Sequence, residues 1–233
     1  MNEFNEKQKK KEKNLEKKKK FSSILTIIMI VLWIITIIEF IDYFNNVPIS
    51  IKSKPIIYIY PEEEMNVSVK LKNDSLITTS YPKYNDGWTV LASPDGTLKD
   101  PETNRSYYGL YYEGKNNDVS MQEDGFIVKG EDTTQFLEEK LELLGLNERE
   151  ANEFIIYWLP RLEESKYNYI RFETKEEIDS YMPLEISPKP DTVIRVVMNF
   201  KPLDEKVKIK EQILTSTQRS GYTVVEWGGS EIK

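Results

Sequence analysis

The sequence predicts an α+β protein: an N-terminal single transmembrane helix, followed by an antiparallel β-rich domain, sandwich-like or rolled, with an inserted αα-hairpin. Three observations predict this class: a long uncharged apolar run, many short apolar segments separated by Gly and Pro turns, and one stretch whose apolar residues recur at helical spacing. The predicted parts are a basic tail at 1–20, the transmembrane helix at 21–44, a linker at 45–54 and the β-rich domain at 55–233.

The transmembrane prediction rests on the run from Phe21 to Ile38, which contains no charged residue. As a helix this run would be about 27 Å long, close to the thickness of the hydrocarbon core of a bilayer. A buried core helix would show a polar face, and the run has none. A cleaved signal peptide would show a small-x-small site after Ile38, where bulky or polar residues stand instead. We therefore expect an uncleaved signal anchor.

The distribution of charge predicts the orientation of this anchor. Residues 1–20 carry nine lysines and four glutamates, whereas residues 21–233 carry 23 basic and 35 acidic side chains. The positive-inside rule then places the N-terminus in the cytoplasm and residues 45–233 outside the cell membrane. Four membrane-proximal lysines are expected to contact the lipid bilayer: Lys17, Lys18, Lys19 and Lys20. Nucleic acid is not an expected partner, because no aromatic side chains interleave this cluster.

Strand patterns dominate the outer domain. Residues 55–60 form a β-branched apolar run, and Met65–Leu71 alternates apolar with polar side chains. The turn at Pro94-Asp95-Gly96 predicts a hairpin over 88–98. Further strands are expected at 106–113, 125–129, 167–172, 184–187, 192–200, 207–209 and 222–227.

The apolar period changes to that of a helix over 133–159, which predicts the αα-hairpin. Gly145 suits the C-terminus of the first helix. Asn147 and Glu150 have the spacing of a capping box for the second helix, which we expect to end at Pro160.

The chain has 233 residues and contains no histidine and no cysteine. This composition excludes imidazole bases, thiolate nucleophiles, disulfides, and zinc sites built from His and Cys. Ser80 and Lys83 match the S-x-x-K motif of Ser-Lys hydrolases, but Ser80 ends a strand pattern instead of opening a helix. Phosphate-binding and calcium-binding loop motifs are missing from the sequence, so we expect no metal and no cofactor.

Several segments carry a resemblance: KPIIYIYPEEE (54–64), GWTVLASPDGTL (87–98), the GEDT, LGLNE and YWLPR motifs within 129–161, KPLDEKV (201–207) and VVEWGG (224–229). They resemble a bacterial family of exported or membrane-anchored proteins with no known activity. The resemblance covers most of residues 54–229. It implies a place at the bacterial cell envelope and one integral outer domain, and it supplies no catalytic residues.

Two carboxylates, Glu113 and Glu226, are the candidates for catalysis, because each stands within an apolar or aromatic strand pattern. Paired carboxylates can hydrolyse glycosidic bonds without histidine or cysteine. A partly buried carboxylate has a raised pKa unless it is paired. The alternative is a structural role, either on an exposed strand edge or in an ion pair with Arg195 or Arg171.

Aromatic residues, 12% of the chain, are the candidates for binding. Within 106–113, Tyr107 and Tyr111 flank Gly109, and we expect both on the exposed face while Tyr108 is buried. Together with Trp88 they are the predicted binding residues, because exposed aromatic rings stack on sugars or contact proteins. The alternative is that these rings pack in the core.

The expected function is that of a single-pass, membrane-anchored extracytoplasmic protein that acts as a non-catalytic binding module at the bacterial cell envelope. Its expected partner is an envelope protein or a wall glycan. One alternative is a carboxylate-based hydrolase of envelope polymers, which a cleft with Glu113 or Glu226 opposite a second carboxylate would favour. The other alternative is a transmembrane signalling component.

Overall fold

The computed structural model describes residues 26, 29–39, 50–116 and 120–232, and the chain divides into two compact units. In the first unit, Met1–Val47, residues 29–39 are helical. Among the described residues, no helix is both long enough and apolar enough to cross a membrane. The rest of the predicted anchor and the basic tail with Lys17, Lys18, Lys19 and Lys20 lie outside the described residues.

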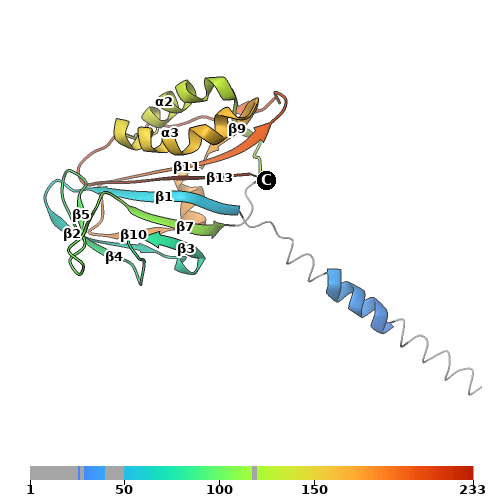
Figure 1. The fold of residues 1–233 in the computed structure, drawn as a ribbon, viewed down its shortest axis with the longest axis horizontal. Helices are drawn as coiled ribbons and strands as arrows, with labels where there is room; N and C mark the ends of the chain where they lie inside the picture. The colour runs from blue at the N-terminus through green and yellow to red at the C-terminus, as the bar shows by residue number, and fades with distance from the viewer. Residues whose placement is uncertain (1–25, 27–28, 40–49, 117–119, 233) are drawn as a thin grey trace, which may run out of the picture. The chain divides into compact units, whose positions relative to one another are not determined.

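The second unit, Pro48–Lys233, consists of three layers (Figure 1). An eight-stranded sheet lies in the middle. Helices α2 (Thr133–Leu143) and α3 (Glu148–Glu163) cover one of its faces, and a five-stranded sheet packs on the other. The predicted α+β class with an inserted αα-hairpin is therefore confirmed for this unit.

The eight-stranded sheet has the order β12-β8-β9-β11-β13-β1-β7-β3, and the five-stranded sheet has the order β10-β2-β4-β5-β6. Most neighbours are antiparallel, as predicted, but β11 pairs with β13 in parallel and β12 pairs with β8 in parallel. The sheet is mixed because the chain passes from β11 to β13 by a crossover and not by a hairpin. The strands are β1 (Ser50–Tyr60), β2 (Met65–Leu71), β3 (Ile77–Tyr81), β4 (Trp88–Ala92), β5 (Leu98–Lys99), β6 (Ser106–Tyr107), β7 (Leu110–Asn116), β8 (Asp124–Lys129), β9 (Tyr167–Phe172), β10 (Leu184–Ser187), β11 (Thr192–Leu203), β12 (Lys210–Glu211) and β13 (Thr223–Glu231).

Two hydrophobic cores hold the layers together, one on each face of the eight-stranded sheet. Side chains of β1 alternate between them: Ile56 and Tyr58 pack beneath the helices, whereas Ile57 and Ile59 pack against the five-stranded sheet. Strand β13 is buried at every position except its last. Strands covered on both faces need apolar side chains on both, which explains the unbroken apolar run of β1.

The helical hairpin follows most of its predicted boundaries. The side chain of Asn147 accepts the backbone N–H of Glu150, and the Glu150 carboxylate accepts the N–H of Asn147, both at 2.9 Å. Gly145 ends α2 with a φ of 94°. The prediction that α3 ends at Pro160 is wrong, because the helix continues to Glu163. The proline leaves the carbonyl of Ile156 without its helical partner, and Ile156 is 74% exposed, so water can bind there.

The predicted single strand at 106–113 is also wrong, because it divides between the two sheets. Strand β6 belongs to the five-stranded sheet and β7 to the eight-stranded sheet, and the chain crosses between them at Tyr108 and Gly109. A Cβ at Gly109 would lie 2.8 Å from Cγ1 of Ile56. The crossing chain therefore needs glycine in order to pass so close to β1.

Three smaller differences concern boundaries and one missed helix. Strand β12 lies at Lys210–Glu211 and not at 207–209, and β1 begins at Ser50, inside the predicted linker 45–54. Helix α4 (Lys175–Tyr181) was not predicted. A capping box of Thr174 and Glu177 begins this helix, and the T-x-x-E spacing in the sequence indicates it.

Substitution of Gly229 by alanine should destabilise the fold where α3 meets the sheet. A Cβ at Gly229 would lie 2.6 Å from the carbonyl oxygen of Met198 and 2.7 Å from the ring of Trp158. Overpacking of this kind costs about 1–3 kcal/mol in the free energy of unfolding, which urea denaturation measures. Gly114→Ala is the control, because its Cβ would have no neighbour closer than 3.4 Å. Equal losses in the two variants would contradict this account of the packing.

Candidate functional site

The eight-stranded sheet is wider than the helix layer on it. The described residues of the core beneath α2 and α3 come from β1, β8, β9, β11 and β13 and not from β7 or β3. Tyr111 in β7 lies opposite Ile56, so its side chain is on the helix side of the sheet. Tyr111 and Glu113 are half-buried there, and Tyr81 of β3, opposite Tyr111, is 57% exposed. A strip of sheet surface therefore stays open beside α3.

One flank of α3 borders this strip. Arg149, Glu153, Tyr157 and Arg161 follow each other at intervals of four residues, so they lie on one side of the helix. The guanidinium of Arg149 is 5.3 Å from the ring centre of Tyr108, and that of Arg161 is 4.6 Å from the ring centre of Tyr157. Ile156 follows Arg149 by seven residues, so it lies on the outer side of α3 next to this flank, and it is 74% exposed. We call the combined surface the α3–β7 face; its members are Tyr81, Tyr108, Tyr111, Glu113, Arg149, Glu153, Ile156, Tyr157 and Arg161.

A buried tyrosine connects the α3–β7 face to the core. The hydroxyl of Tyr58 donates to Glu153 at 2.7 Å and accepts the indole N–H of Trp227 at 3.1 Å. Its ring centre lies 6.3 Å from that of Tyr108. Burial, and then the neighbouring Glu153 carboxylate, raise the pKa of Tyr58, so the hydroxyl remains a donor. The buried Tyr58 thus holds Tyr108 and Glu153 in position.

The centre of the face combines tyrosine hydroxyls with a carboxylate. Burial raises the pKa of Tyr111, and the nearby Glu113 carboxylate raises it further. Tyr157 raises the pKa of Tyr111 slightly further. Ile156 and Tyr108, 74% and 51% exposed, supply accessible apolar and aromatic surface. The face therefore offers stacking surface, hydrogen-bonding groups and charges of both signs.

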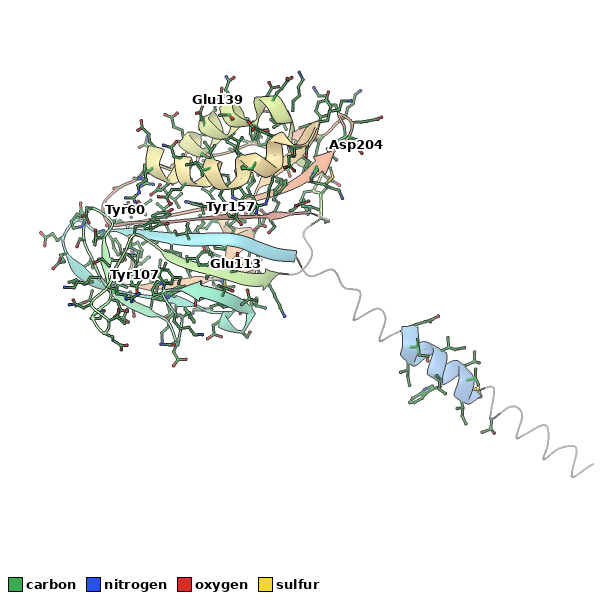
Figure 2. The ribbon with its side chains drawn as sticks, viewed as in Figure 1. Tyr60, Tyr107, Glu113, Glu139, Tyr157 and Asp204 are labelled. Atoms are coloured by element: carbon green, nitrogen blue, oxygen red, sulfur yellow. The ribbon has the colours of Figure 1, made fainter. Side chains whose placement is uncertain are left out.

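One of the three predicted binding residues, Tyr111, lies on this face. The expectation that Tyr107 is on an exposed face is wrong, because Tyr107 is half-buried and packs against the core between the sheets. Its ring lies 5.4 Å from that of Tyr81, whose backbone pairs with Tyr111. Figure 2 shows Tyr107, Glu113 and Tyr157 on their three elements. Trp88 is 4% exposed, because its position in β4 points between the sheets, so it must be removed from the binding residues.

The expectation that Tyr108 is buried is also wrong. The alternation that predicts it holds only within one strand, and the chain leaves the strand at Tyr108. Leu110 and Tyr112, which both lie in β7 and alternate with Tyr111, are buried. Sequence reasoning missed Arg149, Glu153, Tyr157 and Arg161 as surface partners, although their four-residue spacing marks one side of a helix.

Glu226 occupies a different environment, between the two sheets. Its carboxylate accepts the hydroxyl of Tyr112 at 2.6 Å and Nε–H of Arg195 at 2.5 Å, and its side chain is 1% exposed. The guanidinium of Arg195 also donates to Asp179 at 2.6 Å and to the carbonyl of Met182 at 2.9 Å. Burial of Arg195 by itself would lower its pKa, but the neighbouring Glu226 carboxylate outweighs this effect and raises the pKa of Arg195. This is the alternative that the sequence left open, a carboxylate paired with Arg195.

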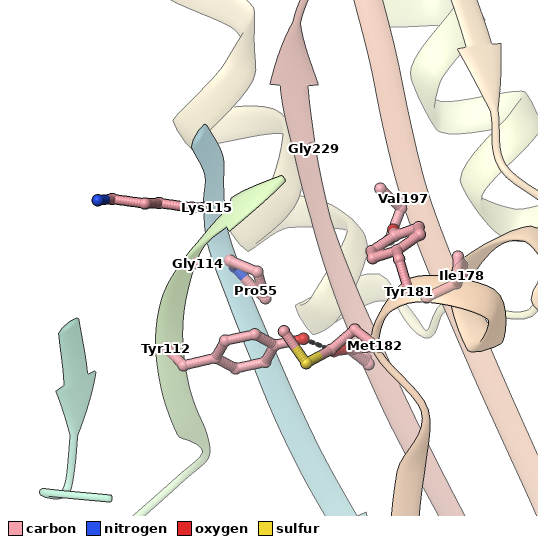
Figure 3. A pocket seen from close by; sticks show the side chains of 10 residues that line it. Pro55, Tyr112, Gly114, Lys115, Ile178, Tyr181, Met182, Val197 and Gly229 are labelled. Carbon is pink, nitrogen blue, oxygen red and sulfur yellow. Dashed lines mark hydrogen bonds between the residues drawn. The ribbon is translucent and has the colours of Figure 1, made fainter. Parts of the chain in front are cut away.

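A small cavity adjoins this buried pair. Its volume is about 20 Å³, and apolar side chains line most of it, together with Tyr112, Tyr181 and Glu226 (Figure 3). A cavity of this size can hold roughly one water molecule. Helix α4 covers the pair with Asp179, which also binds Lys175. The cavity is too small for a sugar or a peptide side chain.

The hydrolase interpretation therefore loses its main candidate. A carboxylate whose two oxygens are bonded inside the protein cannot reach a polymer substrate. Glu113 is accessible, and its structural neighbour is the hydroxyl of Tyr111. Ser80 lies in β3, and its hydroxyl accepts the backbone N–H of Tyr84 at 2.7 Å, which is a turn contact and not a nucleophile at the start of a helix.

Removing one partner of the buried pair should destabilise the protein strongly. Arg195→Met leaves Glu226 buried without a counter-charge, and such a loss costs about 3–5 kcal/mol in the free energy of unfolding. Arg149→Met is the control, because its ion pair with Glu153 is largely exposed and contributes no more than about 1 kcal/mol. In urea denaturation, Arg195→Met combined with Glu226→Leu should recover part of the loss. A double variant no more stable than Arg195→Met would contradict this interpretation.

High pH should unfold the protein through its buried tyrosines. Burial raises the pKa of Tyr222 to about 12, and it raises the pKa values of Tyr58, Tyr112 and Tyr181 as well, from an ordinary value of 10.0. These groups stay protonated in the folded state while the unfolded chain ionises, so the free energy of unfolding is unaffected below pH 10 and falls above it. Tyrosinate absorbance and circular dichroism, followed together, should change together in that range. Ionisation of these four tyrosines with the fold intact near pH 10 would contradict the prediction.

No known protein family, no curated protein and no solved structure matches this chain. The resemblance carried by the motifs at 54–64, 129–161 and 224–229 therefore stays a prediction. Any inference about function must therefore rest on the side chains of the α3–β7 face and of the buried pair.

Proposed function

We propose that the protein is a single-pass, membrane-anchored binding module of the bacterial cell envelope, without catalytic activity, whose outer domain binds a partner protein. The contact surface is the α3–β7 face. The observation that carries this proposal is the gathering there of exposed apolar and aromatic side chains between two arginines that lie over tyrosine rings.

The composition of the face supports a protein partner. Protein interfaces are rich in tyrosine and arginine and poor in lysine, and the residues that dominate binding energy are most often Trp, Tyr and Arg. Lysines make up 17 of the 23 basic residues in 21–233, yet both basic members of the α3–β7 face are arginines. This departure from the composition of the domain favours a protein over a wall glycan.

The rigidity of the face supports tight binding. Tyr58 connects Glu153 to Trp227 within the core, and Arg161 donates to the carbonyl of Tyr157 at 2.9 Å. Side chains that are already ordered lose less conformational entropy when a partner binds. The face thus combines exposed rings with positions that are set before binding.

The membrane anchor and its orientation belong to the proposal as well. They are supported by the uncharged run from Phe21 to Ile38 and by the lysines that precede it. A tail on the cytoplasmic side would leave the outer domain with the α3–β7 face available to other envelope components.

The test is an affinity capture from membranes with the full-length chain. Tyr108→Ser combined with Ile156→Ser should reduce recovery of the protein partner at least about tenfold, because it removes two exposed apolar contacts, one from α3 and one from the β6–β7 crossing. Ile213→Ser is the matched control, since Ile213 is 86% exposed elsewhere on the domain, and it should leave recovery unchanged.

Two outcomes would overturn parts of this proposal. If the wild type retained purified wall glycan and the double variant did not, the α3–β7 face would still be the binding surface, but its partner would be a glycan and not a protein. Equal capture by wild type and double variant would exclude the α3–β7 face. The orientation has its own test, protease treatment of intact cells: cleavage of residues 1–20 with the outer domain protected would reverse the topology.

A further inference from the structure

The eight-stranded sheet ends at β8 in an edge that is only partly covered. Strand β12 has two residues, and it pairs with Asp124 and Gly125 only. On its inner side, β8 pairs with β9 from Phe126 to Lys129. Among the described residues, no strand lies on the outer side of these four positions. The open part of the edge is about 13 Å long.

The backbone groups on this open edge can be assigned from the pairing. The carbonyl of Gly125 points outward, because it accepts the N–H of Gln212 at 3.2 Å. Backbone groups of a strand point alternately to its two sides, so Ile127 and Lys129 point outward as well. The carbonyl of Lys129 accepts the hydroxyl of Thr133 at 3.1 Å. The N–H and C=O of Ile127 and the N–H of Lys129 have no protein partner among the described residues.

A groove of about 820 Å³ runs along this edge, lined by every residue from Gly125 to Lys129. Helix α2 forms one wall with Phe136 and Lys140, and residues 206–209 form the other. Figure 2 labels Glu139 on the α2 wall and Asp204 at the turn that leads into the second wall. The groove therefore has its unpaired backbone groups between two walls of side chains.

The walls supply apolar contacts and positive charge. The rings of Phe126 and Phe136 lie 5.1 Å apart, and the amine of Lys140 lies 5.3 Å from the first and 5.8 Å from the second. In the opposite wall, the exposed Lys206 and Lys208 alternate with Val207 and Ile209. Neither Lys206 nor Lys208 has a carboxylate partner among the described residues.

The groove is much less acidic than the domain. Its lining contains four lysines and three carboxylates, whereas residues 21–233 have 23 basic and 35 acidic side chains. Lys129 pairs with Glu131 at 3.0 Å, so the positive charge open to an occupant is that of Lys206 and Lys208 on one wall and Lys140 on the other. One of the three carboxylates, Glu139, accepts a hydrogen bond from Gln135 at 3.0 Å. An occupant of this groove is therefore favoured if it is acidic.

We propose that this groove binds an extended, acidic segment of a partner polypeptide, which adds to β8 as a further strand. Strand addition satisfies the open N–H and C=O groups of Ile127 and the N–H of Lys129. Alternate side chains of the segment then meet the aromatic wall and the lysine wall, because side chains of a strand point to opposite faces. This site is separate from the α3–β7 face and needs no catalysis.

The test uses the full-length chain in detergent micelles and a blocked heptapeptide that alternates Glu with Val. We expect binding in fluorescence anisotropy, and hydrogen exchange should slow at the amides of Ile127 and Lys129 in the bound state. The same peptide with Lys in place of Glu should bind at least about tenfold more weakly, because charge complementarity is lost. Binding without protection of these two amides would overturn strand addition, and failure to bind would overturn the site.

Variants separate the groove from general electrostatics. Lys206→Glu with Lys208→Glu should weaken binding of the acidic peptide at least about tenfold. Lys99→Glu with Lys189→Glu makes the same change of net charge at exposed positions outside the groove, and it should leave the affinity unchanged. Tyr108→Ser with Ile156→Ser should also leave it unchanged. Equal weakening in the two charge-reversed variants would assign the effect to net charge and overturn the proposal.

Discussion

A buried carboxylate in β13 is the constraint around which the inter-sheet layer is arranged. Strand β13 is covered by helices on one face and by the second sheet on the other, so Glu226 is only 1% exposed. An ionised group in such a place is tolerated only with a counter-charge and further hydrogen bonds. Arg195 from β11 and Tyr112 from β7 supply these, and both strands are thereby tied to β13. Arg195 in turn binds Asp179 and Met182, which holds α4 over the pair.

The two candidate binding surfaces exist because the helices do not cover the whole width of the eight-stranded sheet and β12 does not cover the whole length of β8. Two helices cover five of the eight strands, which leaves β7 and β3 open beside α3. At the opposite end, β12 covers two residues of β8 and leaves four unpaired on their outer side. One surface is rich in tyrosine and arginine and the other in lysine and unpaired backbone groups. Their chemistry suits a folded partner in the first case and an extended segment in the second.

Tyrosine takes over structural roles in a chain that has no histidine and no cysteine. Tyr58, Tyr112 and Tyr181 each donate a hydroxyl to a carboxylate, at 2.7, 2.6 and 2.6 Å. Burial raises the pKa of all three, so they act as neutral donors inside the protein. A ring that packs in the core and a hydroxyl that satisfies a carboxylate allow acidic residues to be placed beneath the surface.

The sequence by itself determined the elements that local physics controls. Apolar periodicity and turn residues predict β2, β9 and β10 with their observed bounds, and the predicted capping box of Asn147 and Glu150 is present. Three features could not be predicted from local sequence: the division of 106–113 between two strands, the continuation of α3 past Pro160, and the burial of Trp88. Each depends on what the segment packs against in the folded protein, which is a neighbouring sheet in two cases and solvent in the third.

The candidate surfaces were decided only by tertiary structure. Arg149 and Tyr108 are far apart in the sequence, and tertiary packing brings the guanidinium of Arg149 to 5.3 Å from the ring centre of Tyr108. Glu226 had two interpretations until the pairing of β11 with β13 placed Arg195 next to it. Spacing along a chain fixes neighbours within one helix or strand, whereas contacts between elements depend on the order of strands and the layers that cover them.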